Sequence, residues 1–203
     1  MKPGKLFIIS GPSQVGKDSI VSRLKRDQSL HLAHIIGNTT RPKRPGEQQH
    51  IYLNFWSEGQ FQKLIDRGEF LEWAIVHDYH YGTLKQPVVE ALKQGLNVIL
   101  NIDVQGAEQI KTKMSEVKLI FITAESPAEL KRRIFASTKM TLQRKNARWT
   151  SAQKELKEMP KYEHVVVNRL NRLNETVAKV KRIITQELKA KGLDLKSNNR
   201  YPR

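Results

Sequence analysis

The stretch that decides the fold is KLFIISGPSQVGKDS, residues 5–19. Its first six residues form a short, mostly apolar run of the kind found in buried strands, and Ile20, Val21 and Leu24 then recur with helical spacing. Between these two predicted elements, glycines at positions 11 and 16 let the backbone curl so that successive N–H groups point at one centre. The positive end of the following helix adds to this field. A strand, a glycine-rich turn and a helix in this order are typical of a loop that binds phosphate.

The lysine of this loop and the two residues after it indicate what is bound. Lys17 supplies a full positive charge to the β- and γ-phosphates of a nucleoside triphosphate, so we predict that the loop binds ATP. The predicted ATP-binding residues of the loop are Gly11, Pro12, Ser13, Gln14, Val15, Gly16, Lys17, Asp18 and Ser19. The position after the lysine is normally Ser or Thr, whose hydroxyl binds Mg²⁺, but here it is Asp18. Because Ser19 follows at once, we predict a Mg²⁺ site at Ser19 and Asp18.

Apolar runs alternate with helical patterns along the rest of the chain. The predicted strands are residues 5–10, 96–102, 118–123 and 164–167, and the predicted helices are residues 17–27, 104–114 and 173–188. Strands that alternate with helices favour an α/β fold with a mostly parallel sheet. We therefore predict the three-layer fold of P-loop NTPases, with a parallel central sheet between two layers of helices.

Two segments interrupt this alternation and predict subdomains within a single domain of residues 1–203. Residues 38–81 combine a Pro/Gly-rich stretch with aromatic, alternating segments, which indicates a small mixed-β insertion. Residues 127–150 are polar and strongly basic, which favours a mobile lid. We expect an acceptor-binding subdomain at 37–85, a lid at 127–150, a core of residues 1–36, 86–126 and 151–190, and a frayed basic tail at 191–203.

The chain is strongly basic, and most of the excess lies in its last third. It has 36 Lys and Arg against 20 Asp and Glu, a formal net charge of +16. From Leu130 onward there are 20 basic and 6 acidic residues, which accounts for +14 of that charge. One interpretation is nucleic-acid binding through this region, and the other is a solvated basic face beside a polyphosphate site. We favour the second, since no zinc knuckle or RNP-like aromatic motif supports the first.

Composition excludes several other classes of protein. The absence of cysteine excludes disulfides and zinc sites with cysteine ligands. No apolar block approaches the ~18–20 residues that a membrane span needs, and the first residues lack the pattern of a signal peptide. These features lead us to expect a soluble, cytoplasmic protein, and they do not indicate its oligomeric state.

A second group of residues suggests a site for another phosphate. TTRPKRPGE, residues 39–47, places two arginines three positions apart in a rigid Pro/Gly loop, and guanidinium groups bind phosphate bidentately. With this loop the sequence resembles the guanylate kinase family, and the resemblance extends to about residue 188. The matching pieces are the phosphate loop, TTRPKRPGE, FLEWA at 70–74, YGT at 81–83, NIDVQGA at 101–107 and VVVN at 165–168.

The resemblance implies that GMP or dGMP is the phosphate acceptor. It implies that Arg41, Arg44, Tyr52 and Tyr81 bind the acceptor's phosphate, that Glu72 and Thr83 read the guanine base, and that Asp103 lies near the base or its ribose. The chemistry of guanine agrees, because its adjacent N1–H and N2–H₂ donors match a single carboxylate. Adenine lacks this donor pair and would leave the carboxylate unpaired.

The resemblance also assigns the donor side. Arg133 and Arg148 match lid arginines that close over the phosphates during transfer. Together with Lys17 and Arg41 they are the predicted catalytic residues, with Mg²⁺ as the cofactor. Asn168 matches a position that helps to hold the base of ATP.

The chain departs from the family's pattern at several positions. Asn101 stands where the family usually has Asp or Glu, Gly37 replaces a serine, and Ser137 replaces a further lid arginine. Relatives that phosphorylate sugar phosphates also favour an aspartate like Asp18, so one alternative is a kinase for an acceptor such as ribose 1,5-bisphosphate. Another alternative is a catalytically impaired binding module, against which the retained Lys17 argues.

Overall fold

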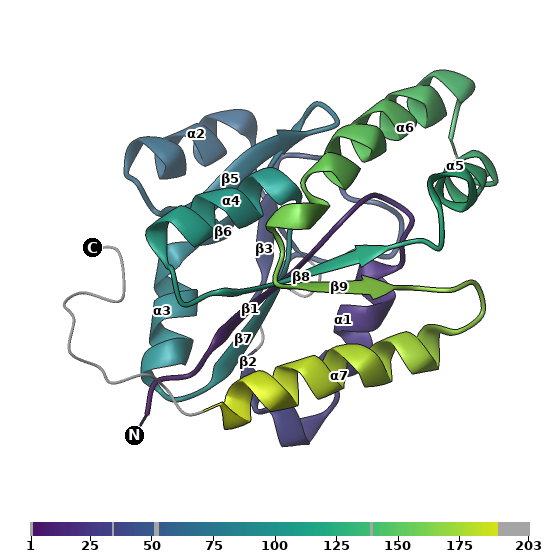
Figure 1. The fold of residues 1–203 in the computed structure, drawn as a ribbon. Coiled ribbons are helices and arrows are strands. Elements are labelled where there is room, and N and C mark those ends of the chain that lie inside the picture. The colour runs from purple at the N-terminus through teal and green to yellow at the C-terminus, as the bar shows by residue number, and fades with distance from the viewer. Residues whose placement is uncertain (1, 34, 51–52, 139, 191–203) are drawn as a thin grey trace.

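The computed structural model describes residues 2–33, 35–50, 53–138 and 140–190, which form two sheets and the helices around them (Figure 1). The strands are β1 (Leu6–Ser10), β2 (Leu32–Ala33), β3 (Gly37–Thr39), β4 (Leu53–Phe55), β5 (Phe70–Val76), β6 (Tyr79–Leu84), β7 (Asn97–Asn101), β8 (Lys118–Thr123) and β9 (His164–Val167). The α-helices are α1 (Lys17–Lys25), α2 (Glu58–Asp66), α3 (Lys85–Lys93), α4 (Val104–Lys113), α5 (Pro127–Phe135), α6 (Leu142–Lys157) and α7 (Leu173–Lys189). Single 3₁₀ turns follow α1 and α6, at Gln28–Leu30 and Met159–Lys161.

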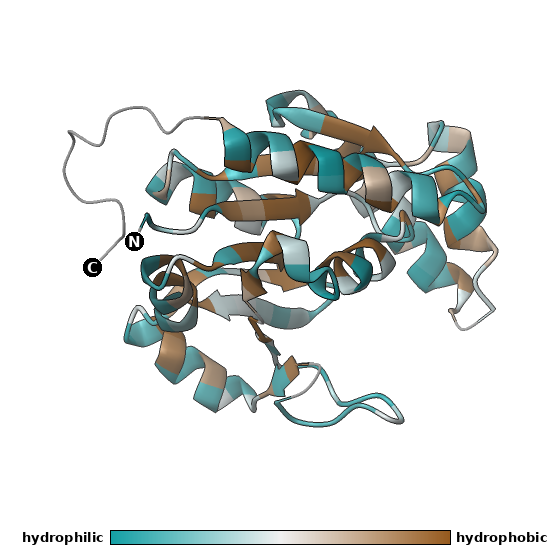
Figure 2. Cartoon of the chain, turned by 90° about the horizontal axis from the view of Figure 1, so that it is seen from below, coloured by the Kyte–Doolittle hydropathy of each residue, from teal (hydrophilic) through white to brown (hydrophobic). Residues whose placement is uncertain are grey.

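The larger sheet has the strand order β2-β7-β1-β8-β9, and all its strand pairs are parallel. Helices α1 and α7 cover one face, and α3 and α4 cover the other. Because β1, β7 and β8 lie between these layers, their side chains are almost all buried, which explains their apolar runs (Figure 2). The predicted α/β fold with a parallel central sheet is confirmed. The predicted strands at 118–123 and 164–167 have their predicted bounds, and the other two are slightly shorter than predicted.

The smaller sheet has the order β4-β3-β6-β5 and lies wholly within residues 37–85. Its β3–β4 pair is parallel and its other pairs are antiparallel, so the predicted mixed-β insertion is present. Helix α2 packs on it through Phe61, whose ring stacks on Phe70 with a centroid distance of 4.4 Å. Two side chains of α4 join this sheet to the core. Gln109 exchanges two hydrogen bonds with the backbone of Trp73, and Lys113 donates to the Leu71 carbonyl.

Helix α5 and the N-terminal part of α6 form the segment predicted as a lid, residues 127–150. Ser126 caps α5 and Thr141 caps α6, each accepting a hydrogen bond from a backbone N–H of the first helical turn. Helix α6 continues to Lys157, because no Gly or Pro interrupts it, so the predicted boundary at residue 150 falls inside a helix. Ala152 of α6 is buried in the central core, which anchors the C-terminal half of this helix.

The C-terminal tail and the length of the helices were the subject of two further predictions. The predicted frayed tail at 191–203 lies outside the described residues. Among the residues that are described, no helix combines the length and the apolar character that a membrane crossing requires.

Candidate active site

The turn between β1 and α1 has the backbone of a phosphate-binding loop. Gly11 and Gly16 have φ angles of 128° and 91°, and Gln14 has a φ of 67°. A Cβ on Gly11 would lie 2.1 Å from the carbonyl oxygen of Ile122, so a side chain cannot be placed there. These conformations turn the loop's N–H groups inward and place the N-terminus of α1 behind them. The loop therefore presents a concave, positively polarised surface that suits phosphate oxygens.

Lys17, the first residue of α1, reaches back over this loop. Its Nζ donates hydrogen bonds to the carbonyl oxygens of Gly11 and Pro12, the second at 2.9 Å. Burial lowers the pKa of Lys17, and the nearby carboxylates of Glu155, Asp18 and Asp103 act in the opposite direction. Neutral carbonyl oxygens thus hold the ammonium group beside the loop, and phosphate oxygens can replace them without the loss of an ion pair.

Arg148 links the predicted lid to the phosphate loop. Its Nη1 donates to the Ser13 hydroxyl at 2.8 Å, although 135 positions separate the two residues in the sequence. Burial lowers the pKa of Arg148, and the positive charge of Arg44 lowers it further. Arg44 belongs to the acceptor loop, so the fold brings cations of the lid and of the acceptor loop toward one another. Two guanidinium groups that repel each other favour an anion between them.

Arg133 and Asn168 support the loop from behind. The Asn168 side chain is buried, and its Nδ2 donates to the Val15 carbonyl at 2.8 Å while its Oδ1 accepts from the Thr176 hydroxyl at 2.7 Å. Arg133 donates to the Asn168 carbonyl at 3.0 Å and pairs with Glu129 at 2.8 Å. Unlike Arg148, Arg133 makes no hydrogen bond with a residue of the loop itself in the part of the chain that the structure describes.

The residues predicted for Mg²⁺ lie at the start of α1. Asp18 and Ser19 are exposed there, and the Asn101 side-chain amide donates a hydrogen bond to the Asp18 carboxylate. Within the described ranges, no group of three or more His, Cys, Asp or Glu residues is placed to hold a metal ion. Mg²⁺ is usually held by one or two carboxylates together with substrate phosphates and water. This small donor set therefore fits an ion that arrives with a nucleotide.

The acceptor loop is organised around Arg41. This side chain is only 8% exposed, and it forms two parallel hydrogen bonds with the Glu47 carboxylate at 2.7 and 2.6 Å. Glu47 also accepts from the Arg44 backbone N–H at 2.8 Å. These bonds raise the pKa of Arg41 and lower the pKa of Glu47 to about 2. The nearby Tyr81 hydroxyl also raises the pKa of Arg41. The structure thus brings together Arg41, Arg44 and Tyr81, whereas Tyr52 lies outside the described residues.

Glu72 and Thr83 form a buried pair on the strands β5 and β6. Glu72 is 2% exposed, and the Thr83 hydroxyl donates to its Oε1 at 2.6 Å. Burial raises the pKa of Glu72 to about 7, and the nearby Asp103 raises it too, while the hydrogen bond from Thr83 has the opposite effect. A Cβ at Gly106 would lie 2.4 Å from Glu72 Oε2, so this glycine leaves the space that the carboxylate occupies. Within the described residues this carboxylate accepts hydrogen bonds from Thr83 alone, so it retains capacity to accept further hydrogen bonds.

Asp103 connects the two halves of the site. Its carboxylate caps α4 by accepting from the N–H groups of Gln105 and Gly106 at 2.7 and 3.2 Å. It is close enough to affect the pKa of Lys17 and of Glu72. Asp103 therefore lies between the phosphate loop and the predicted base-reading pair.

Two carboxylates of the site were not singled out from the sequence. Glu47 lies three residues after Arg44 in the stretch TTRPKRPGE. A carboxylate this close to two arginines in a tight loop was the sequence signal for an ion pair. Glu155 lies seven residues after Arg148, two helical turns along the same face of α6. Burial raises the pKa of Glu155 to about 7, and Lys17 acts in the opposite direction.

Comparison with known proteins identifies the family of this chain. The family model described as guanylate kinase matches residues 3–187. The chain is 36% identical over 185 residues to a guanylate kinase of Haemophilus ducreyi, covering 91% of this chain and 89% of that protein. It is 38% identical over 187 residues to a guanylate kinase of Clostridium tetani, with 92% and 88% covered. The crystal structure of guanylate kinase from Anaplasma phagocytophilum superposes with a TM-score of 0.74 at 26% identity, covering 94% of this chain and 89% of that one. The chain therefore belongs to the guanylate kinase family.

Proposed function

We propose that this protein transfers the γ-phosphate of ATP to GMP or dGMP and releases ADP with GDP or dGDP. The observation that supports this choice of acceptor is the buried Glu72 carboxylate beside Thr83, in the small sheet whose strand β3 leads into the loop of Arg41 and Arg44. A sugar phosphate offers hydroxyl groups but no base, so it lacks a pair of adjacent N–H donors for this carboxylate. Guanine presents two adjacent N–H donors that one carboxylate accepts together.

Recognition of guanine follows from the cost of an unsatisfied buried charge. With GMP bound, the N1–H and N2–H₂ groups would donate to Glu72, and Thr83 would keep the carboxylate oriented. AMP would leave the same carboxylate desolvated without donors, so it is rejected. Arg41, Arg44 and Tyr81 would bind the phosphate of the acceptor, and the same role is proposed for Tyr52, which lies outside the described residues.

The donor side would bind ATP through the loop of residues 11–19. Lys17 and Arg148 would exchange their neutral partners for oxygens of the triphosphate, while Asn168 and Arg133 keep the loop in place. Closure of α5 and α6 over both substrates would exclude water from the reaction. These residues do not need to transfer a proton. Their work is to align the two phosphates and to neutralise charge.

The transfer itself is an in-line displacement. A phosphate oxygen of GMP forms a bond to the γ-phosphorus of ATP, and the bond from that phosphorus to the β–γ bridging oxygen breaks. Mg²⁺ bound with ATP would supply positive charge at the β- and γ-phosphate oxygens, and Asp18 and Ser19 would hold it. Asn101 would orient Asp18 for this purpose, since its amide already donates to that carboxylate.

An ADP-release assay with ATP, Mg²⁺ and separate acceptors tests this proposal. GMP, dGMP, AMP, UMP and ribose phosphates are compared at equal concentration. We expect turnover with GMP and dGMP and little with the others. Turnover with a ribose phosphate alone would overturn the choice of acceptor, and silence with every acceptor despite ATP binding would indicate a binding module.

A further inference from the structure

Strand β9 is the edge of the central sheet on the side away from β2. Among the described residues it pairs with β8 alone, in parallel register from Ile120–His164 to Thr123–Val167. The side chains of Val165 and Val167 are 47% and 38% exposed, which is unusual for valine in a central sheet. A sheet edge of this kind can pair with a further strand unless something protects it.

The outward-facing backbone groups of β9 follow from its pairing with β8. The Asn168 N–H donates to the Thr123 carbonyl at 2.8 Å, so residue 168 points toward β8. Alternate residues of a strand direct their N–H and C=O groups to the same side. Val166 and His164 therefore also face β8. The N–H and C=O groups of Val165 and Val167 face away from the sheet.

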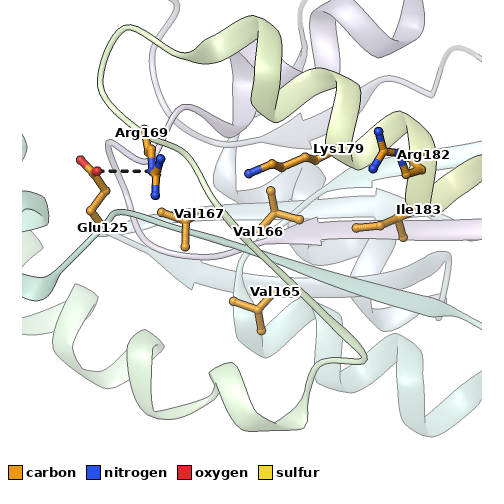
Figure 3. A pocket seen from close by; sticks show the side chains of 8 residues that line it. All are labelled: Glu125, Val165, Val166, Val167, Arg169, Lys179, Arg182 and Ile183. Carbon is orange, nitrogen blue, oxygen red and sulfur yellow. Dashed lines mark ion pairs between the residues drawn. The ribbon is translucent and has the colours of Figure 1, made fainter.

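A groove of about 680 Å³ lies beside this edge, between β9 and α7 (Figure 3). Its lining residues are Glu125, Val165, Val166, Val167, Arg169, Lys179, Arg182 and Ile183. The three valines come from β9, whereas Lys179, Arg182 and Ile183 come from α7 (Figure 3). The floor of the groove is therefore apolar and its α7 side is basic.

The charges of this groove are only partly balanced. Arg169 pairs with Glu125 at 3.5 Å. Lys179 and Arg182 make no ion pair or side-chain hydrogen bond with any other residue in the described ranges. Two cations that have no partner among the described residues, beside an apolar strand edge, complement an acidic strand. Neither cation belongs to the phosphate site, so the groove is separate from the proposed catalytic function.

We propose that this groove binds an extended acidic segment of another protein, which adds to the sheet as a strand beside β9. The backbone of such a segment pairs with the outward groups of Val165 and Val167, its apolar side chains cover the valines, and its carboxylates meet Lys179 and Arg182. A second copy of this chain is a poor partner, because its net charge of +16 repels the same surface. A nucleic acid satisfies the cations but leaves the valines and the strand edge uncovered.

The test uses a fluorescein-labelled peptide of about ten residues, the length of a long strand, in which Glu alternates with Val. The full chain is titrated into this peptide and fluorescence anisotropy is recorded, with a Lys-for-Glu peptide as the control. We expect the acidic peptide to bind and the Lys-for-Glu peptide not to bind. Hydrogen exchange of the Val165 and Val167 amides should slow when the acidic peptide is present. We expect the double variant K179E and R182E to weaken binding at least about tenfold, whereas K63E with K93E, an equal change of charge elsewhere, leaves it unchanged.

The variant Val165→Pro distinguishes strand addition from adhesion to a basic surface. It removes an outward N–H and keeps an apolar side chain of similar size, so pairing with β8 is retained and ADP release with GMP stays at the wild-type rate. Loss of peptide binding in this variant supports the proposal. Unchanged binding, absence of amide protection, or preferential binding of an oligonucleotide would each overturn it. The proposal would also be overturned if sedimentation showed that the protein self-associates without peptide and this association slowed hydrogen exchange of the Val165 and Val167 amides.

Discussion

The acceptor loop and the phosphate loop differ in the partners that their cations hold. Arg41 is bound by a carboxylate, Glu47, through two hydrogen bonds of 2.6 and 2.7 Å. Lys17 and Arg148 are bound by neutral oxygens, from loop carbonyls and from the Ser13 hydroxyl. An incoming phosphate therefore meets a guanidinium that is already paired with a full negative charge at one end of the site, and cations that are held only by dipoles at the other.

This difference indicates two ways to prepare a phosphate site. A guanidinium has five N–H donors, of which Arg41 uses three for Glu47 and the Pro42 carbonyl. The remaining N–H groups of Arg41, which also meet Tyr81, can turn to a phosphate while the side chain stays aligned on Glu47. Lys17 and Arg148 have weaker partners and are free to move onto the triphosphate. The acceptor side is thus preorganised, and the donor side rearranges on binding.

The largest expected effect is at Lys17. Lys17→Ala removes the charge nearest the transferred phosphate and should lower kcat by about 10⁴-fold, with the fold intact by circular dichroism. Lys93→Ala, an exposed lysine at the end of α3, is the matched control and should keep wild-type kcat. Near-normal turnover in the Lys17 variant would remove the phosphate loop from the mechanism.

Arg148 tests the lid side of the comparison. Arg148→Ala should lower kcat by about 10³-fold, because one cation that stabilises the developing charge is lost. Arg144→Ala, one turn earlier on the exposed surface of α6, should change kcat less than about twofold. Equal losses in the two variants would mean that the general charge of the lid matters and that the contact with Ser13 does not.

Glu72 tests base recognition. Glu72→Gln keeps the shape of the side chain but removes its charge, so the preference for GMP over AMP in kcat/KM should fall by about 10²-fold. Glu69→Gln, at the start of the same hairpin, should keep the preference. An unchanged preference in the Glu72 variant would transfer base recognition to other residues.

Glu47 tests the preorganisation of the acceptor loop. Glu47→Gln should raise KM for GMP about tenfold, or about 1.4 kcal/mol, because Arg41 and Arg44 lose the group that holds them. The KM for ATP should stay within about twofold, since Glu47 contacts no residue of the phosphate loop in the described ranges. A fall in KM for GMP would instead show that Glu47 competes with the acceptor phosphate.

The pKa of Glu72 predicts a gradual change of KM for GMP with pH. Burial raises this pKa to about 7, and only the ionised carboxylate accepts from both guanine donors. Affinity for GMP is therefore complete well above pH 7 and is lost as the pH falls through 7, so KM for GMP should rise about tenfold from pH 8 to pH 6. The Glu72→Gln variant is the control for titration of GMP itself. The same pH dependence in that variant would exclude Glu72 as its origin.

The sequence determined much of the fold and the family. Continuous apolar runs at β1, β7 and β8 predicted buried parallel strands, because only a sheet covered on both faces buries every side chain of a strand. The phosphate loop was equally clear, since its glycines and lysine are local requirements of backbone geometry and charge. Roles for Arg41, Glu72 and Arg148 came from the resemblance of six motifs in order, and they stay predictions.

Tertiary structure alone decided which groups meet across the chain. Arg148 contacts Ser13 across 135 positions, the Asn101 amide binds the Asp18 carboxylate across 83, and the Lys179 and Arg182 side chains lie beside an open strand edge. The raised pKa of Glu72 likewise depends on burial that its own segment does not encode. Local patterns specify backbone conformation and amphipathic faces, because these depend on neighbours in sequence. Partners, burial and pKa depend on residues that the fold brings from far along the chain, so the sequence by itself left them open.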